Sequence, residues 1–193
     1  MSAGADLSTA GISIRDQFIA PRQIRSLVEC AQARCAQGEF AAARVGNDAG
    51  RRRRADIRGD FTCWLREPLY PAERLLLEEL EQLRLELNRE AYLGLFELEL
   101  HYAWYPPGAA YARHLDQPRG AAQRKVSLAL YLNTEWEPPA GGALRIFDAD
   151  AGFRDVEPIA GRLVCFLTEG REHAVLPAHR DRWSISGWFR ARA

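Results

Sequence analysis

The chain has 193 residues, of which 47% are hydrophobic and 27% charged, so it is long enough to bury the core of one folded domain. Basic and acidic residues both number 26, and this balance gives no electrostatic reason to expect nucleic acid or an anionic membrane as a partner. No apolar run approaches the roughly 18 residues of a membrane span. We therefore expect a single domain over residues 1–193 with no membrane contact.

The cysteine pattern bears on the compartment. None of the four forms a C-x-x-C pair, and they are Cys30, Cys35, Cys63 and Cys165. Scattered cysteines in a chain of this size indicate reduced thiols. The first twenty residues contain Asp6, Arg15 and Asp16 and no long apolar run, which is not the pattern of a signal peptide. We therefore expect a cytoplasmic location.

The first half of the chain predicts supporting elements. Residues 1–10 are small and polar and are expected to be loose, and residues 11–18 are expected to form a short strand or entry segment. Pro21 opens a helix with apolar residues at helical spacing that ends near Gly38. A leucine stripe with Glu/Arg pairs on the other face predicts the strongest helix over residues 71–91. We expect these two helices to pack against one side of a sheet.

A loop and a strand are expected between the two helices. Residues 45–59 carry Gly, Asn, Asp and four consecutive arginines, Arg51–Arg54, which predicts a mobile loop. Residues 61–65 resume a strand. The arginine run is read first as a solvated loop, second as a docking site for an acidic or backbone-rich partner surface, and last as a nucleic-acid contact, since no wider basic face surrounds it.

The second half changes to short strands separated by turns rich in Gly and Pro. The expected strands cover residues 95–105, 111–114, 124–132, 142–147, 154–156, 162–167, 172–175 and 182–190. So many short strands indicate a double-sheet jelly roll and not βαβ units. The predicted fold is mostly β, a double-stranded β-helix whose N-terminal helices pack on one sheet. Residues 1–94 would support the jelly roll formed by residues 95–193.

The most informative motif is His114-Leu115-Asp116, followed far downstream by His173. Residues i and i+2 on a strand share a face, so His114 and Asp116 can hold one ion with Leu115 turned away into packing. We expect His173 to come from a strand on the opposite side of the barrel mouth. Two imidazoles and one carboxylate are the ligand set of non-haem Fe(II) oxygenases. The competing interpretation is a surface pair together with a core histidine.

Arg182 strengthens the metal hypothesis. It opens the segment 182–188, in which Arg182, Ser184, Ser186 and Trp188 share one face. A buried arginine needs an anionic partner, and its planar guanidinium suits the far carboxylate of a dicarboxylate cosubstrate. The alternative is an ordinary ion pair, for instance with Asp181.

Other marked side chains have plainer interpretations. His101 is expected to be a satisfied strand residue and not a ligand, and His179 a solvent-facing turn residue. Trp64 and Trp104 are expected to be core aromatics. Alternation along 95–105 puts Tyr105 on the same face as Glu97, Glu99 and His101, so either this face turns polar toward a cavity mouth or a bulge resets the register.

Several pieces together make the chain resemble the prolyl 4-hydroxylase branch of the 2-oxoglutarate/Fe(II) dioxygenases, closest to the hypoxia-inducible-factor type of prolyl hydroxylase and its bacterial relatives. The matching pieces run from about residue 57 to 190. They are Ile57-Arg58-Gly59-Asp60, Tyr105-Pro106, Tyr111-Ala112-Arg113-His114-Leu115-Asp116, Tyr131-Leu132-Asn133, Gly141-Gly142-Ala143-Leu144-Arg145-Ile146, His173-Ala174-Val175-Leu176-Pro177 and Arg182 through Trp188.

The resemblance implies a role for each matching side chain. The iron ligands would be His114, Asp116 and His173. Arg182 would bind the distal carboxylate of 2-oxoglutarate beside the Tyr131 hydroxyl, and Tyr105 and Ser184 would complete the cosubstrate site. On the substrate side, Trp188 would line the cavity, and Asp60 and Arg124 look like the matching pair near the entrance.

The implied activity is that of a procollagen-proline-type prolyl 4-hydroxylase. It uses Fe(II), O2 and 2-oxoglutarate to hydroxylate proline in a protein, yielding succinate and CO2, with ascorbate as a candidate stimulant. The loop 45–58 departs from the family by being short and arginine-rich, which leaves the substrate open, with elongation factor Tu as the leading candidate. The alternatives are a dioxygenase of another substrate class, such as a nucleic-acid demethylase, and a non-catalytic jelly-roll binding module.

Overall fold

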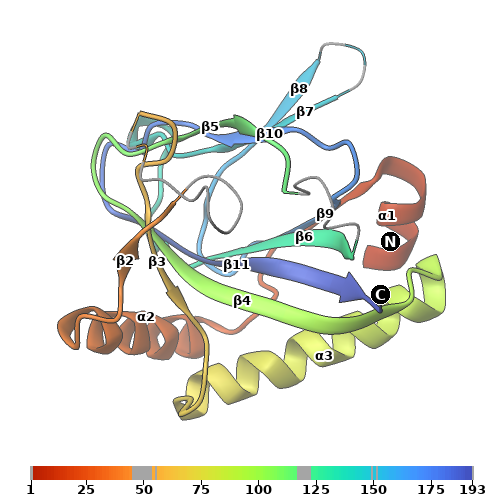
Figure 1. Cartoon of the computed structure of the whole chain (residues 1–193), viewed down its shortest axis with the longest axis horizontal. Coiled ribbons are helices and arrows are strands. Elements are labelled where there is room, and N and C mark those ends of the chain that lie inside the picture. Colours follow the sequence, from red (N-terminus) through yellow and green to blue (C-terminus); the bar gives the residue numbers. More distant parts are fainter. Residues whose placement is uncertain are drawn as a thin grey trace.

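Two antiparallel sheets face each other in the computed structural model, which describes residues 2–44, 54, 56–116, 123–148, 150 and 152–192 (Figure 1). The larger sheet has the order β1-β9-β6-β11-β4-β3-β2 and the smaller one β5-β10-β7-β8. Side chains of both sheets, among them Tyr131 and Ile146, form one buried cluster between them. This confirms the predicted jelly roll.

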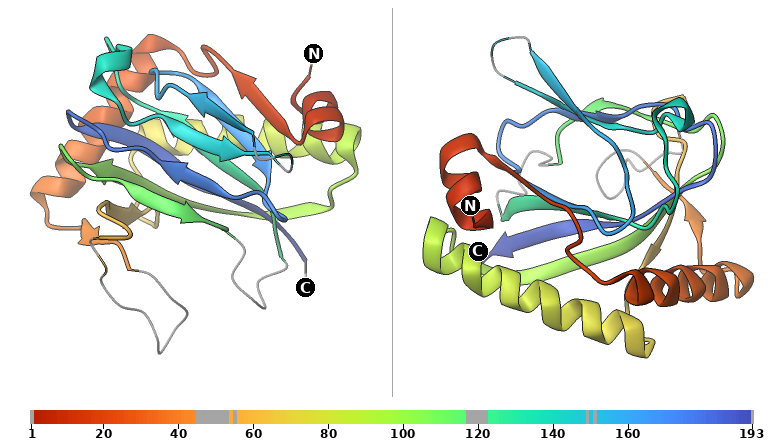
Figure 2. Two further views of the ribbon diagram at one scale, coloured as in Figure 1. Left: turned by 90° about the horizontal axis from the view of Figure 1, so that it is seen from above. Right: turned by 180° about the vertical axis from the view of Figure 1, so that it is seen from behind.

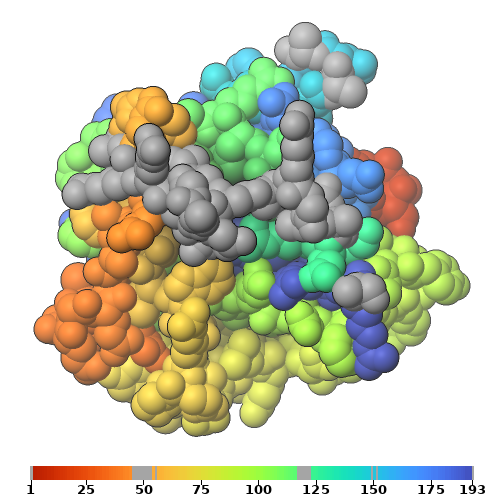
Figure 3. Space-filling model, in the orientation of Figure 1, coloured from red at the N-terminus to blue at the C-terminus, as the bar shows by residue number. Residues whose placement is uncertain are grey.

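The strand bounds follow the predicted ones within two residues. They are β1 Ile12–Arg15, β3 Phe61–Trp64, β4 Leu95–Tyr105, β5 Tyr111–His114, β6 Arg124–Tyr131, β7 Leu144–Phe147, β8 Phe153–Val156, β9 Leu163–Leu167, β10 His173–Val175 and β11 Arg182–Ala191, except that β1 is shorter than expected. The sequence did not indicate β2 Ala41–Ala42 or the 3-10 turn Pro138–Ala140. The β7–β8 hairpin projects from the molecule (Figures 1 and 3).

The two long helices cover the outer face of the larger sheet, as predicted (Figure 2). They are α2 Pro21–Ala36 and α3 Pro71–Ala91, and in the space-filling view they form the lower edge of the molecule (Figure 3). Helix α3 begins where Pro71 supplies a preset φ and Glu73 accepts a 2.9 Å bond from the Tyr70 amide. Four of its leucines are buried against the sheet at helical spacing, Leu76, Leu80, Leu83 and Leu87, which leaves the inner face of that sheet free to shape a site.

The expectation that residues 1–10 are loose is wrong. They form helix α1 Ala3–Ala10, capped by the Ser2 hydroxyl, which accepts a bond from the Ala5 amide. The small residues serve close packing on α3: a Cβ at Gly4 would lie 2.5 Å from Glu90 Cβ. Leu7 is fully buried. The composition that suggested disorder instead reflects a helix that needs tertiary contact to form.

The loop expected over residues 45–59 falls largely outside the described residues, and so do Arg51, Arg52 and Arg53. Arg54 is exposed and pairs with Asp56 at 2.8 Å, which fits the solvated interpretation for this arginine. All four cysteines are free, and three are buried. No helix in the described part of the chain is both long and apolar enough to span a bilayer.

Strand β11 forms the floor of the space between the sheets, with β4 on one side and β6 on the other. Its register with β4 is regular from Arg182–Tyr105 to Arg190–Glu97. No bulge therefore resets the alternation, and Glu99, His101 and Tyr105 do share a face. The polar end of this face carries ion pairs between the strands, because Arg190 contacts both Glu97 and Glu99. The first of the two expected explanations, a face that turns polar toward the mouth, is confirmed.

Candidate active site

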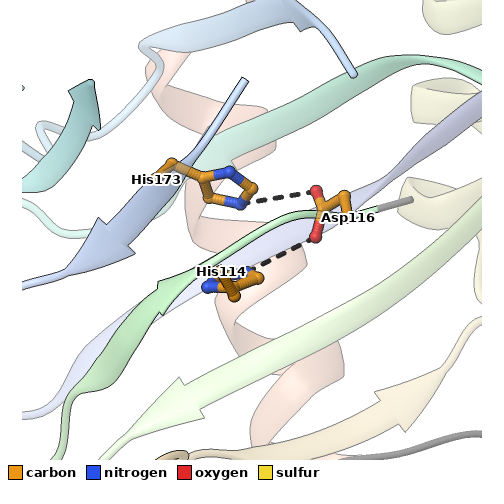
Figure 4. Close-up of side chains that lie close together, drawn as sticks. All are labelled: His114, Asp116 and His173. Carbon is orange, nitrogen blue, oxygen red and sulfur yellow. Dashed lines mark ion pairs between the residues drawn. The ribbon is translucent and has the colours of Figure 1, made fainter. Parts of the chain in front are cut away.

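The three predicted metal ligands meet between the sheets (Figure 4). His114 ends β5 and His173 begins β10, and the two residues are direct partners in the antiparallel pair. The expectation that His173 lies across the barrel mouth is therefore wrong, since its strand is the neighbour of β5. Asp116 lies two residues beyond the end of β5, so it is not on the strand as the i, i+2 spacing predicted. The carboxylate still points back to both imidazoles.

The ligand atoms are close enough to hold one ion. Nε2 of His114 is 3.4 Å from Oδ1 of Asp116, and Nε2 of His173 is 3.4 Å from Oδ2. All candidate ligand atoms lie within 4.8 Å of one another. The other ring nitrogens are engaged by the backbone: Nδ1 of His114 is 2.8 Å from the Ala112 carbonyl, and Nδ1 of His173 is 3.2 Å from the Arg171 carbonyl. This orientation directs both Nε2 atoms inward, as in metal sites.

Neighbouring charges and hydrogen bonds keep the Asp116 carboxylate ionised and oriented. Burial opposes its ionisation, but the neighbouring His173 and His114 hold the pKa of the Asp116 carboxyl well below its usual range. Ser127 on β6 donates a 2.9 Å bond to Oδ2 and is itself 3.0 Å from the Thr168 hydroxyl. The carboxylate is therefore ionised and oriented, which is the state that metal binding requires.

A cavity of about 70 Å³ opens from this cluster along β11. Its lining includes residues of β4, β5, β6, β10 and β11, which places the three ligands on one wall. Arg182 closes one end and Trp188 lies toward the other, six residues along the same strand. At about 3.3 Å per residue this spacing puts the two residues roughly 20 Å apart along the strand, so they belong to different ends of the site.

Arg182 occupies the base of the cavity and is 2% exposed. Its Nε donates to the Gly142 carbonyl at 2.7 Å, and NH1 is 3.5 Å from the Ser184 hydroxyl. Within the described ranges no carboxylate pairs with it, and the expected alternative partner, Asp181, instead accepts from Trp104 at 2.8 Å. A buried guanidinium with no acid beside it indicates a site for an anionic ligand.

Two tyrosines flank this guanidinium. Its carbon lies 5.0 Å from the centre of the Tyr105 ring and 5.1 Å from that of Tyr131. The Tyr131 hydroxyl is buried with no hydrogen-bond partner among the described residues, and burial raises the pKa of Tyr131 to about 12. A neutral hydroxyl donor thus sits beside the cation, and together they can bind one carboxylate. The structure brings together Arg182, Tyr131, Tyr105 and Ser184 as expected.

The predicted substrate residues lie toward the mouth but form different pairs. Asp60 is buried and bonded to Arg58 at 2.7 Å, whereas Arg124 pairs with Glu99 at 3.0 Å. The expectation that Asp60 and Arg124 pair with each other is therefore wrong, because each forms an ion pair with a different residue. Arg124 also lies 3.6 Å over the Trp188 ring, which lines the cavity.

Three apolar side chains are more exposed than expected. Leu115 does not turn into packing but is 45% exposed, because the chain leaves the strand at this point. Trp64 is 38% exposed, and Trp104 is only partly buried, so neither is a core residue. His179 is exposed as predicted, in the turn that precedes β11.

Sequence reasoning missed four site residues. Ser127 holds Asp116, and Tyr111 stacks on His114 with ring centres 3.5 Å apart. Arg58 lies 4.6 Å over the Tyr111 ring while it pairs with Asp60. His101 lines the cavity and is not satisfied, since its Nδ1 is buried with no partner in the described part. Alternation along β6, with Ser127 two and four residues from Ala129 and Tyr131, was the available signal for Ser127.

Comparisons with known proteins agree with this geometry. The profile of the 2OG-Fe(II) oxygenase superfamily matches residues 100–190. A Pseudomonas putida prolyl-4-hydroxylase structure is similar with 42% identity and a TM-score of 0.90 over 99% of this chain and 98% of that chain. A Trichoplax adhaerens prolyl hydroxylase in complex with a hypoxia-inducible-factor peptide has 25% identity and a TM-score of 0.87, over 97% of this chain and 87% of that chain.

Curated relatives point the same way. Egl nine homolog 1 of Homo sapiens is 37% identical over 153 residues, which is 72% of this chain but 35% of that protein. Prolyl hydroxylase EGLN3 of Homo sapiens is 34% identical over 79% of this chain and 64% of that protein. The chain thus spans about a third of the first relative and under two thirds of the second.

The fold and the site define a 2-oxoglutarate-dependent oxygenase, and the chain belongs to the 2OG-Fe(II) oxygenase superfamily. Its similar proteins include prolyl hydroxylases. Members of this superfamily require Fe(II), 2-oxoglutarate and O2. The residues present fit these groups: the triad offers two imidazoles and a carboxylate, and the unpartnered Tyr131 hydroxyl beside Arg182 offers donors for a carboxylate.

Proposed function

We propose that this protein hydroxylates C4 of proline in a protein substrate. One observation supports this most strongly: the His-Asp-His cluster and Arg182, which has no carboxylate partner among the described residues, line the same cavity. The chain that carries them is 42% identical to a prolyl-4-hydroxylase. When bound at this cluster, Fe(II) would supply the oxidation of proline by O2, coupled to conversion of 2-oxoglutarate to succinate and CO2.

The residues of the chain would divide the work by position. His114, Asp116 and His173 hold the metal, with Ser127 keeping the carboxylate in place. Arg182 and the Tyr131 hydroxyl bind the distal carboxylate of 2-oxoglutarate, and Tyr105 and Ser184 shape the same end. This placement orients the cosubstrate toward the triad and excludes water from the base of the cavity.

The mouth would receive the proline. Trp188 lines the cavity where the pyrrolidine ring would enter, and Arg124, 3.6 Å over the indole, together with the stacked His101 keeps that indole in position. Asp60 is paired with Arg58, and Arg58 lies over the Tyr111 ring of β5, so this pair can shape the entrance on the β5 side. Proline lacks a charge, so an aromatic wall with paired charges around it suits this ring better than a charged pocket.

We also propose that the domain acts as one unit over residues 1–193, because β1, β2 and β3 from the first half join the same sheet as strands from the second. Residues 1–94 would support the jelly roll of residues 95–193. A protein partner bearing the target proline is favoured over nucleic acid, and the free cysteines are consistent with a cytoplasmic location.

The test is a mass-spectrometric search for hydroxyproline. Host-cell lysate and purified elongation factor Tu, the candidate suggested by the resemblance, are each incubated with the protein, Fe(II), 2-oxoglutarate and ascorbate. We expect a gain of one oxygen on a proline, absent with Asp116→Ala. Release of formaldehyde from methylated single-stranded DNA, without any proline product, would instead identify a demethylase. If Fe(II) and 2-oxoglutarate give no visible absorption band under anaerobic conditions, the protein is a binding module.

A further inference from the structure

His101 sits at a place that its expected role does not explain. It lies on β4, on the strand face that lines the cavity, and is 4% exposed. Its ring stacks on that of Trp188 with centres 5.5 Å apart and also contacts the Trp64 ring, whose centre is 5.0 Å from that of His101 and 6.3 Å from that of Trp188. Two indoles therefore hold the imidazole in a fixed orientation at the mouth, away from the metal ligands.

Two nitrogens in this stack have no hydrogen-bond partner among the described residues: Nδ1 of His101 and Nε1 of Trp188. Both side chains are at least nine-tenths buried. Proteins rarely leave buried N–H groups unpaired, because a group taken out of water without a new bond is costly. Two such groups on neighbouring rings, both in residues that line the cavity, point to a polar ligand that binds there during the protein's work.

The chemistry of the two groups narrows that ligand. Burial, reinforced by Arg58, lowers the pKa of His101 to about 4, so its imidazole is neutral near pH 7 and has one N–H to donate. The indole of Trp188 is a donor only. The wall thus carries no net charge: the indole N–H donates, and the neutral imidazole offers one N–H donor and one acceptor nitrogen, so a neutral carbonyl oxygen suits this wall better than a carboxylate.

The charges around the mouth do not alter this conclusion. Glu99 is paired with Arg124 and Arg190, and Asp60 is paired with Arg58. With these acids neutralised, the wall favours a neutral acceptor. A proline residue has no backbone N–H, so the backbone next to it is rich in carbonyl acceptors relative to donors.

We propose that His101 is a specificity-determining residue: its imidazole N–H, together with the Trp188 indole N–H, donates to backbone carbonyl oxygens of the substrate peptide next to the target proline. This inference rests on the proposed prolyl hydroxylation and adds how the substrate is recognised. Because the two indoles already fix the imidazole, the bond forms with little loss of side-chain freedom.

The test compares variants on a library of 11-residue peptides, each with one central proline and varied flanks. His101→Phe keeps a flat ring in the stack and removes the N–H, and His101→Gln restores an N–H donor. His179→Phe is the matched control, since His179 is exposed and lies outside the cavity lining. Hydroxylation is read by mass, and succinate formed without peptide reports the cosubstrate site separately.

We expect His101→Phe to raise KM for the best peptide about three- to tenfold, the range for loss of one hydrogen bond. KM for 2-oxoglutarate and peptide-free succinate formation should stay unchanged, His101→Gln should recover most of the loss, and His179→Phe should match the wild type. If His101→Phe melts at a lower temperature than the wild type, His101→Met, equally without a ring N–H, takes its place.

Removal of single carbonyls from the peptide gives an independent readout. Peptides in which one amide C=O within two residues of the proline is reduced to CH2 are compared on wild type and His101→Phe. At one position the wild type should lose affinity while the variant loses none further. Equal losses at every position, or an unchanged KM in His101→Phe, overturn the inference while prolyl hydroxylation stands. If the wild type hydroxylates no proline peptide, the proposed function fails first.

Discussion

Nε of Arg182 donates a 2.7 Å hydrogen bond to the carbonyl oxygen of Gly142, a residue forty positions earlier in the chain. This bond uses one edge of the guanidinium and leaves its terminal nitrogens directed toward Ser184 and the cavity. The backbone of the loop before β7 thus sets the orientation of the cation at the base of the site.

Replacement of Arg182 tests its role in binding the cosubstrate. Arg182→Lys keeps the charge but loses the planar pair of N–H donors and the bond to Gly142. We expect KM for 2-oxoglutarate to rise about 10- to 100-fold, the range for loss of charge-assisted hydrogen bonds. Steady-state succinate formation measures it. Arg180→Lys, on the exposed turn two residues earlier, is the control, and an equal change in both variants would contradict the assignment.

Gly142→Ala should weaken cosubstrate binding indirectly. Gly142 has φ of +69°, and a Cβ there would lie 3.0 Å from Cδ of Arg182. The added methyl strains the backbone by about 1–3 kcal/mol and displaces the arginine. Gly38→Ala is matched, with φ of +75° and open space around its Cβ. Both variants should melt earlier, but only Gly142→Ala should raise KM for 2-oxoglutarate. Equal KM values in the two would show that Arg182 tolerates the shift.

Ser127→Ala should reduce metal affinity without removing a ligand. Ser127 donates to Oδ2 of Asp116, and loss of such an outer contact typically costs about 10- to 100-fold in affinity. Fe(II) or Mn(II) titration under anaerobic conditions measures the change. Thr168→Val is the control, because it removes the neighbouring hydroxyl and leaves the Ser127–Asp116 bond intact. The same affinity in Ser127→Ala and wild type would mean that the histidines alone orient the carboxylate.

The buried pair Arg34–Glu73 predicts an acid-sensitive stability. Glu73 is fully buried and accepts bonds of 2.8 and 2.7 Å from Arg34. Burial opposes its charge, but these bonds outweigh that cost and lower the pKa of Glu73 below its ordinary value of 4.5. A lowered folded pKa stabilises the fold above about pH 4.5, and this stabilisation is lost as pH falls through the folded value.

Urea unfolding of wild type and Glu73→Gln at several pH values checks this. At pH 7 the variant should be less stable by about 3 kcal/mol, since Arg34 loses a buried partner. The difference should shrink below pH 4.5, where the wild type loses its own pair. Other carboxylates titrate in both proteins and cancel in the comparison. Parallel stability curves across this range would contradict the prediction.

The sequence predicted the jelly roll and the metal cluster well because both leave local marks. Alternation and turn residues identify strands, and the order of His114, Asp116, His173 and Arg182 matches one chemistry. The placement of the ligands was less predictable. The pairing of β5 with β10 joins segments far apart in the sequence, and the residues around His173 do not indicate which strand is its neighbour.

The errors share a physical cause. Helix α1 forms because Gly4 allows close approach to α3, and Leu115 is exposed because the chain turns after β5. Asp60 binds Arg58, two residues away, and not the distant Arg124. Each outcome depends on tertiary contacts that local composition does not encode.

The arrangement of the cavity along one central strand separates two kinds of change. Arg182 and Trp188 belong to the same strand but to opposite ends of the cavity, and β4 and β6 brace that strand on both sides. Substitutions at the Trp188 end can therefore change peptide binding without changing how the Arg182 end would bind a small dicarboxylate. A library confined to Trp64, Glu99, His101 and Arg124 is therefore expected to change which peptide is selected while 2-oxoglutarate binding stays unchanged.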